Sequence, residues 1–337
     1  MFVNLAKDPA FSVGELTASI NILPNKYGRL EQLNLFPVKG VRTRTIFVEE
    51  QNGVLTLLQS QPVGAPGQTG KQGKRKVRSF VIPHLPHDDI VLPQDVEGIR
   101  AFGSQDAFKT VQSEILDKLQ SMKNKHDITL EHLRIGALKG IILDADASTL
   151  YNLYTEFGIV QKTVDFVLGT AGTEVVEKCR EVLRHIEDNL KGEVMNGVRC
   201  VVSQEFYDKL VKHATIKAIY QNWSAAQEKL GGDLRKGFQV AGITFEEYRG
   251  VASDAAGNAR RFIASGDGHA FPEGTTETFR TVVSPADFNE TVNTVGLPYY
   301  AKFDERKHGR GYDLHTQSNP LAICYRPAVL VRVYSSN

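Results

Sequence analysis

The feature that most constrains this chain is a long apolar stripe between residues 104 and 140. Large apolar side chains recur there at spacings of three and four, the period of one face of an α-helix. They are Phe108, Val111, Ile115, Leu119, Met122, Leu130, Leu133 and Leu138. Ser104 can cap the first turn and Gly140 can end the last one. The spacing predicts one helix over 104–140, about 50 Å long.

A helix with one narrow apolar face needs a partner surface. Burying each large apolar side chain stabilises a fold by about 1.5–3 kcal/mol, so we expect the stripe to lie along a sheet or another helix, with the other faces in water. Hydrophobic residues make up 41% of the chain and charged residues 23%, which is typical of a globular protein. A length of 337 residues allows roughly two or three domains.

A β-rich stretch over 41–82 is the second constraint. Its first residues are rich in β-branched side chains, and Asn52-Gly53 is a preferred pair for a tight turn into a return strand. Residues 59–73 are rich in Gly, Pro and Gln, and 76–82 form another β-like run. We therefore predict a long β arm with a loose tip. An isolated ribbon is marginal in water, so one face needs a partner in the same subunit or in a neighbouring copy.

The remaining segments mix helices with strands. Residues 1–40 alternate short apolar runs with Pro and Gly, which predicts an extended arm without a core. Helices are predicted over 173–191, with Thr173 as the N-cap, and from Ser203 onward. Strands are predicted at 141–143, 150–157, 164–168, 198–202 and 328–333, with short strands over 237–279. Because the elements do not alternate as βαβ units, the predicted fold class is α+β.

One local cluster departs from the nearly neutral balance of the chain. The net charge is only +1, which gives no overall attraction to nucleic acid or anionic membranes. A basic run of five side chains lies within eight positions: Lys71, Lys74, Arg75, Lys76 and Arg78. We expect inter-subunit contact with an acidic patch. Binding of nucleic acid through its phosphates is an alternative, although no aromatic side chains are interleaved for base stacking, and simple solvation is a third.

Two other clusters have the composition of catalytic sites. The first could hold a divalent metal in a hydrolase: His84, His87, Asp88 and Asp89. It lies in a proline-rich stretch, so we favour a solvated connection. The second, Asp144 and Asp146, has the neighbours of a tight turn rather than of paired catalytic carboxylates. No nucleotide-binding or catalytic motif occurs in the sequence, so we expect no enzymatic activity, no metal and no cofactor.

The cysteines and the apolar runs bear on the cellular location. Cys179, Cys200 and Cys324 are odd in number and widely spaced, which predicts buried thiols in a reducing compartment. The N-terminus lacks the basic and apolar regions of a signal peptide. The longest uncharged stretch, 51–70, is interrupted by Gly and Pro and cannot form a membrane-spanning helix. We expect neither secretion nor contact with a membrane.

Four segments carry a resemblance to a known family. They are FVIPHLPHDDIVLPQDVEGIRAFG at 80–103, FQVAGITFEEYRG at 238–250, FPEGTTETF at 271–279, and the tail 296–333 with GLPY, QSNPL and RP in turn. In the same order, these segments resemble parts of the lambda-type major capsid proteins of tailed bacteriophages, the protein E family. The likeness spans roughly residues 40–334, most of the chain. None of the four segments is catalytic.

The resemblance implies the tailed-phage capsid fold of the Hong Kong 97 type. Its parts would be an N-terminal arm over 1–40, an E-loop over 41–90, a peripheral domain over 91–165 with a spine helix at 104–140, an axial domain over 166–281, and a return to the peripheral domain over 282–337. It also implies a structural subunit that self-assembles into hexamers and pentamers of an icosahedral head around double-stranded DNA. Implied partners are its own copies, scaffold, portal, a decoration protein and, non-specifically, the DNA. The implied location is the virion capsid, and the host cytoplasm during assembly.

Overall fold

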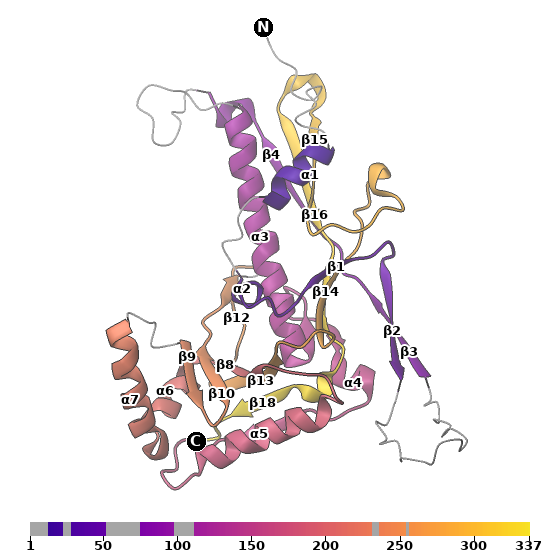
Figure 1. Ribbon diagram of the computed structural model, residues 1–337. Coiled ribbons are helices and arrows are strands. Elements are labelled where there is room, and N and C mark those ends of the chain that lie inside the picture. Colours follow the sequence, from indigo (N-terminus) through magenta and orange to yellow (C-terminus); the bar gives the residue numbers. More distant parts are fainter. Residues whose placement is uncertain (1–12, 23–27, 52–74, 98–110, 231–235, 254–255) are drawn as a thin grey trace, which may run out of the picture.

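The computed structural model describes residues 13–22, 28–51, 75–97, 111–230, 236–253 and 256–337. Its longest element is helix α3, Val111–Lys139, which stands upright in the middle of the molecule (Figure 1). The predicted start of this helix at Ser104 lies outside the described residues. Its end is as predicted, because Gly140 follows with a φ of +74°. A Cβ atom there would lie 2.4 Å from the Tyr154 ring, so only glycine fits without strain.

The expectation that α3 has one apolar face and otherwise lies in water is wrong. Its apolar stripe is buried, with Ile115, Leu119 and Met122 almost fully covered. Polar side chains on other faces are buried too: Lys123, His126, Asp127, Glu131 and Arg134. The reason is that other elements surround the helix, and the polar groups pair with one another or with those elements. Lys123 Nζ lies 3.1 Å from Asp127 Oδ2, and the Tyr299 hydroxyl donates to Asp127.

A six-stranded mixed sheet lies beside the C-terminal end of α3. The strand order is β7 (Lys162–Asp165), β18 (Val331–Tyr334), β13 (Asp267–Glu273), β8 (Gly197–Val202), β10 (Ile243–Glu247) and β9 (Lys236–Val240). Only the β7–β18 and β8–β10 pairs are parallel. The strand predicted at 198–202 is confirmed. Because β18 lies between β7 and β13, the sheet is continuous only when residues 331–334 have joined it.

Helices cover this sheet, as Figure 1 shows. They are α5 (Val175–Asn189), α6 (Gln204–Lys212) and α7 (Ala214–Leu230). The apolar stripe of α5 is buried, as its periodicity predicts, although its N-cap is Glu174 and not Thr173. The predicted helix start at Ser203 is confirmed, and Ser203 is its N-cap, since the hydroxyl accepts a hydrogen bond from Phe206 N at 3.3 Å.

Smaller sheets flank α3. One has the order β15 (Tyr300–Glu305), β16 (Tyr312–Ser318) and β4 (Leu85–Val91), and another the order β1 (Val38–Gly40), β14 (Phe279–Val283) and β17 (Pro320–Cys324). Three two-stranded ribbons pair β2 (Thr45–Gln51) with β3 (Arg75–Val81), β5 (Ile141–Leu143) with β6 (Thr149–Asn152), and β11 (Val251–Ser253) with β12 (Ala259–Arg261). Short 3-10 helices occur at Pro93–Asp95, Asn289–Thr291, Lys307–Gly309 and Pro327–Val329.

The N-terminal segment is not the featureless arm that its sequence indicates. Within its described part it forms α1 (Val13–Ile22) and α2 (Arg29–Gln32). Leu16 and Ile20 of α1 are buried against β15, and Leu30 of α2 is buried in the main core. Local composition does not reveal these helices, because they owe their stability to contacts with distant parts of the chain.

Three local expectations need correction. The predicted strand at 150–157 is split into β6 and helix α4 (Leu153–Phe157), because the Asn152 side chain caps the helix by accepting from the backbone N–H groups of its first turn. The predicted strand at 328–333 starts only at Val331, after a 3-10 turn. Residues 85–91, expected to be a connection, form β4.

The cysteine prediction is confirmed: Cys179, Cys200 and Cys324 are free and buried. Burial raises the pKa of each thiol, that of Cys179 to about 12, so these sulfurs stay protonated and unreactive. Among the helices of the described segments, none is both long and apolar enough to span a bilayer.

Candidate assembly surface

The β2–β3 ribbon projects sideways from the body of the molecule (Figure 1). Its strands are antiparallel, and Phe47 lies opposite Ser79. The partner of β2 is therefore the second β-like run of the sequence. The predicted turn at Asn52-Gly53, its return strand and the tip at 59–73 lie outside the described residues.

The inner face of the ribbon packs on the body. Ile46, Val48 and Phe80 are buried in the main core. The Phe80 ring lies 5.2 Å from the Tyr151 ring in an edge-on arrangement. The Tyr151 hydroxyl donates to Val81 O at 2.9 Å, so aromatic packing and a hydrogen bond fix the root of the ribbon together.

The outer face of the ribbon carries an apolar stripe that is exposed. Phe47 is 70% exposed, Val77 58% and Val81 57%. Because Phe47 pairs with Ser79, Val77 and Val81 are its two diagonal neighbours across the strands, and the three side chains share one face. We call Phe47, Val77 and Val81 the outer stripe. Contiguous exposed apolar side chains of this kind mark a surface for another macromolecule.

The structure describes only part of the basic run. Lys71 and Lys74 lie outside the described residues, and the side chain of Arg75 is not described. Lys76 is exposed. Arg78 instead turns back to its own subunit: its guanidinium lies 4.5 Å from the centre of the Phe157 ring, and its Nε donates to Glu156 O at 2.6 Å. Contact of this run with another subunit stays a prediction.

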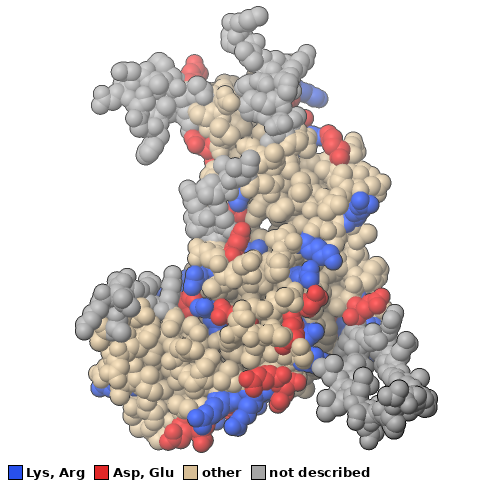
Figure 2. All heavy atoms as spheres, viewed as in Figure 1, with Lys and Arg blue, Asp and Glu red and all other residues tan. Residues whose placement is uncertain are grey.

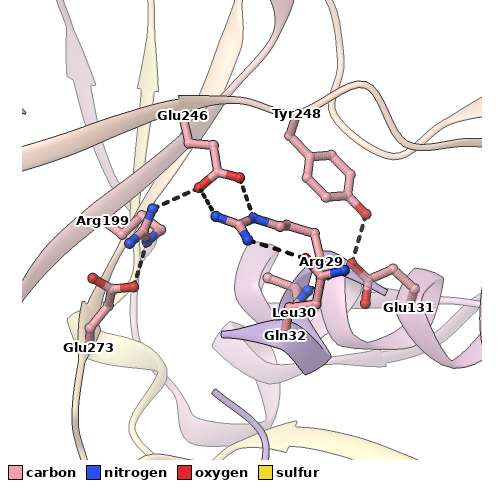
Figure 3. Close-up of polar contacts among 8 residues, drawn as sticks. All are labelled: Arg29, Leu30, Gln32, Glu131, Arg199, Glu246, Tyr248 and Glu273. Atoms are coloured by element: carbon pink, nitrogen blue, oxygen red, sulfur yellow. Dashed lines mark hydrogen bonds and ion pairs between the residues drawn. The ribbon is translucent and has the colours of Figure 1, made fainter. Parts of the chain in front are cut away.

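The N-terminal segment is held to the body by buried ion pairs at α2 (Figure 3). Arg29 donates hydrogen bonds to Glu246 of β10 from two nitrogens, at 2.5 and 3.0 Å. Arg199 of β8 donates to Glu246 at 2.7 Å and to Glu273 of β13 at 2.5 Å. The Glu246 side chain is only 1% exposed, so two guanidinium groups compensate one desolvated carboxylate.

The same segment is bonded to α3. Leu30 N donates to Glu131 Oε1 at 3.0 Å, and the Tyr248 hydroxyl donates to the same oxygen at 3.0 Å. Burial raises the pKa of Glu131, and its other oxygen has no hydrogen-bond partner. We call Arg29, Leu30, Glu131, Arg199 and Glu246 the clamp, because α2 thereby joins α3 to the six-stranded sheet. Sequence reasoning missed it. Of the clamp residues, only Glu246 lies in a segment that the sequence singled out, 238–250, and that segment was noted for its family resemblance.

The two clusters with catalytic composition do not form sites of that kind. The first is split by the alternation of β4: His87 lies 3.0 Å from Lys125 Nζ, whereas Asp88 contacts His315. Over the residues with described placement, no three His, Cys, Asp or Glu side chains converge as metal ligands. Asp146 accepts from Ser148 N at 2.8 Å in the turn between β5 and β6, as expected for a turn former.

Surface charge follows the balance seen in the sequence. On the face drawn in Figure 2, basic and acidic side chains are interspersed and no large area carries one sign. Such a face offers no continuous track for a phosphate backbone.

Comparisons with known proteins agree over almost the whole length. The family model of phage major capsid protein E matches residues 12–335. The major capsid protein of Pseudomonas phage KPP10 is 29% identical, with 96% of each chain covered, and that of Salmonella phage Felix O1 is 27% identical, again with 96% of each covered.

Solved structures show the same fold. The putative capsid protein of a prophage of E. coli CFT073 matches with a TM-score of 0.62 at 14% identity, covering 96% of this chain and 99% of that one. The capsid structure of cyanophage P-SCSP1u gives 0.51 at 13%, covering 94% and 90%. The fold is thus the α+β capsid fold of the Hong Kong 97 type. The chain belongs to the phage major capsid protein E family, and its role is that of a structural subunit of the virion shell, not of an enzyme.

Proposed function

We propose that this chain assembles as hexamers and pentamers into an icosahedral head around double-stranded DNA, and that the outer stripe of the ribbon packs on a neighbouring copy. The exposure of the stripe carries the proposal. Three apolar side chains on a projecting ribbon are costly in water, and a protein that builds a shell from its own copies presents a neighbour at every such ribbon.

The proposed role as a shell subunit also implies a division of the chain into capsid-fold segments. The segment 1–40 serves as the arm, 41–90 as the E-loop, 91–165 as the peripheral domain, 166–281 as the axial domain, and 282–337 as the return. The position of the ribbon at 45–81 and the six-stranded sheet with its covering helices support this division. The joining of β4 to β15 and β16 supports placing the end of the E-loop segment beside the returning tail.

Other partners follow from the same role. A closed head needs a route for DNA, so a portal occupies one vertex, and a scaffold sets the curvature. A decoration protein is a further partner on the outer surface. Assembly then takes place in the host cytoplasm. The low net charge suits a wall that contacts the genome only non-specifically.

Deleting residues 59–73 tests the proposal, because this removes the segment predicted to be the tip and leaves the described strands intact. We expect a soluble subunit with an unchanged thermal unfolding midpoint and no shells in negative-stain images under assembly conditions. Normal particles from the deletion variant would show that the arm is dispensable. Dispersed wild-type monomers at high concentration, with scaffold and portal supplied, would refute assembly itself.

A further inference from the structure

A second exposed apolar surface lies on the connection between β14 and β15. Val292 is 65% exposed, Val295 49% and Leu297 45%. We call these three residues the loop patch. The eleven residues between Glu290 and Lys302 include no charged side chain, so the loop patch lies in an uncharged stretch. Apolar side chains that are exposed together in this way mark a surface for another macromolecule.

Hydrogen bonds within the chain hold the loop patch in one conformation. The Thr291 hydroxyl donates to Ala286 O at 2.8 Å, and the Thr294 hydroxyl donates to Thr291 O at 2.7 Å. Leu297 N donates to the Tyr300 hydroxyl at 2.8 Å. A surface that is already ordered loses little conformational entropy when a partner binds it. The loop patch is therefore preorganised for a contact.

The same connection is joined to the root of the ribbon through β1. Gly296 N donates to Val41 O at 2.9 Å, and a Cβ atom at Gly40 would lie only 2.6 Å from Val295 Cγ1. Val38, on the same face of β1 as Gly40, is 50% exposed. The exposed apolar surface thus continues from the loop patch onto the strand that leads into the ribbon. Figure 1 shows the connection and the ribbon on the same side of the molecule.

The charges that flank the loop patch in the sequence are compensated within the chain. Glu290 pairs with Lys302 at 3.4 Å, and Lys302 Nζ lies 5.5 Å from the centre of the Phe288 ring. Lys39 is exposed, but strand alternation places it on the opposite face of β1 from Val38. An apolar centre with a polar rim is the usual composition of a contact between proteins.

We propose that the loop patch packs against a second copy of this chain, next to the contact that the ribbon makes. This inference rests on the proposed function, because an assembly of copies presents such a partner to every subunit. The position of the loop patch favours a copy, since the patch lies on the side of the ribbon and is joined to its root. Its lack of charge favours a copy over DNA, because an uncharged surface does not attract phosphates. Burial against a copy removes the exposed apolar side chains from water.

Thiol labelling of the full-length variant Val295→Cys tests the proposal. The native cysteines are buried and protonated, so a maleimide reports on the introduced thiol. In the unassembled subunit it should react as readily as Val160→Cys, a matched control at a position that is 93% exposed. In assembled shells Val295→Cys should react at least about tenfold more slowly, because labelling then requires the contact to open. Equal rates in subunit and shell would overturn the proposal.

Phe47→Cys, labelled in the same way, separates this inference from the proposed function. Protection of Phe47→Cys together with full labelling of Val295→Cys would retain the ribbon contact and remove the loop patch. Full labelling of both variants in intact shells would overturn both contacts. If Val295→Cys forms no shells while its thermal unfolding midpoint equals that of wild type, the loop patch is needed for assembly and the proposal is supported.

Two further measurements identify the occupant and remove the dependence on one variant. Val292→p-benzoylphenylalanine, irradiated in shells, should give a crosslinked product of twice the subunit mass, and the unassembled variant at the same concentration should not. A crosslink only to a different protein would overturn the choice of a second copy. In wild-type protein, amide hydrogen exchange over residues 291–298 should be slower in shells than in the subunit. Unchanged exchange there would contradict the proposal without any substitution.

Discussion

The clamp and the outer stripe differ in which kind of side chain is buried and which is exposed. At the clamp, a carboxylate that would prefer water is buried, and two arginines compensate it within the same chain. At the outer stripe, three apolar side chains that would prefer burial are left in water. The ion pairs of the clamp form within one subunit, whereas we propose that a neighbouring copy covers the stripe. Changes at the clamp should therefore act on folding, and changes at the stripe on assembly.

Glu246→Gln should have the largest effect on the subunit. It removes the counter-charge of Arg29, which is 28% exposed, and leaves Arg199 paired only with Glu273, so the expected loss is up to about 3 kcal/mol of unfolding free energy. Denaturant unfolding of the unassembled subunit measures it. The control is Glu277→Gln, whose exposed pair with Arg280 contributes at most about 1 kcal/mol. Similar losses from the two variants would mean that the clamp is no stronger than a surface ion pair.

The second-largest effect on subunit stability should come from lowering the pH. Burial lowers the pKa of His126 to about 4, below the 6.5 of an exposed imidazole. As the pH falls, the histidine therefore binds a proton in the unfolded chain before it does so in the folded one. The free energy of unfolding should decrease by roughly 3 kcal/mol between about pH 6.5 and 4. The difference between wild type and His126→Gln across this range isolates the contribution, and the exposed His308→Gln is the control. Parallel pH profiles for wild type and His126→Gln would contradict the prediction.

Arg78→Gln should cost the subunit about 1 kcal/mol, because it removes the contact with the Phe157 ring and the bond to Glu156 O. Lys76→Gln, which changes an exposed lysine on the same strand, should stay within about 0.5 kcal/mol of wild type. Chemical denaturation of both variants makes the comparison. If Arg78→Gln kept full stability but lost shells, Arg78 would belong to the assembly surface and not to the body.

Phe47→Ser should have the smallest effect on the subunit, within about 0.5 kcal/mol, because the ring is already exposed. It should nevertheless lower the yield of shells strongly, as counted in negative-stain images. Val194→Ser is the control, since Val194 is 77% exposed and belongs to the connection between α5 and β8, not to the ribbon. Full shell yield from Phe47→Ser would remove the outer stripe from the proposed contact.

The sequence revealed those parts of the fold that depend on neighbours along the chain. The stripes of α3 and α5 and the cap at Ser203 are local patterns, and local patterns carry their own structural signal. The stripe of α3 says nothing, however, about Lys123 or Glu131 on its other faces. Their burial depends on elements from distant parts of the chain that pack around the helix. From the sequence alone, a charged side chain on a helix is therefore expected to be exposed to solvent.

The same reasoning explains what was missed at the two surfaces. The clamp joins Arg29, Glu131 and Glu246, which are more than a hundred residues apart from one to the next, so no spacing rule connects them. The two β-like runs of the ribbon were foreseen from their β-branched residues, but their pairing with each other was not, because the return strand was predicted directly after Asn52-Gly53. Its partition into a buried and an exposed face was not, because this requires the positions of Tyr151 and Phe157 in the body.

The placement of α1 and β1 has a consequence for the order of events during translation. Thr17 Oγ1 accepts from Ala301 N at 3.2 Å, Asn21 donates to Tyr299 O at 2.9 Å, and Val38 of β1 pairs with Thr281 of β14. Residues 17–38 thus dock on residues 281–301, which the ribosome makes much later. A nascent polypeptide cannot finish this subunit early, and contacts of such long range make the final step slow. These contacts form only after residue 301 has been made, so the N-terminal segment reaches its docked position late in folding.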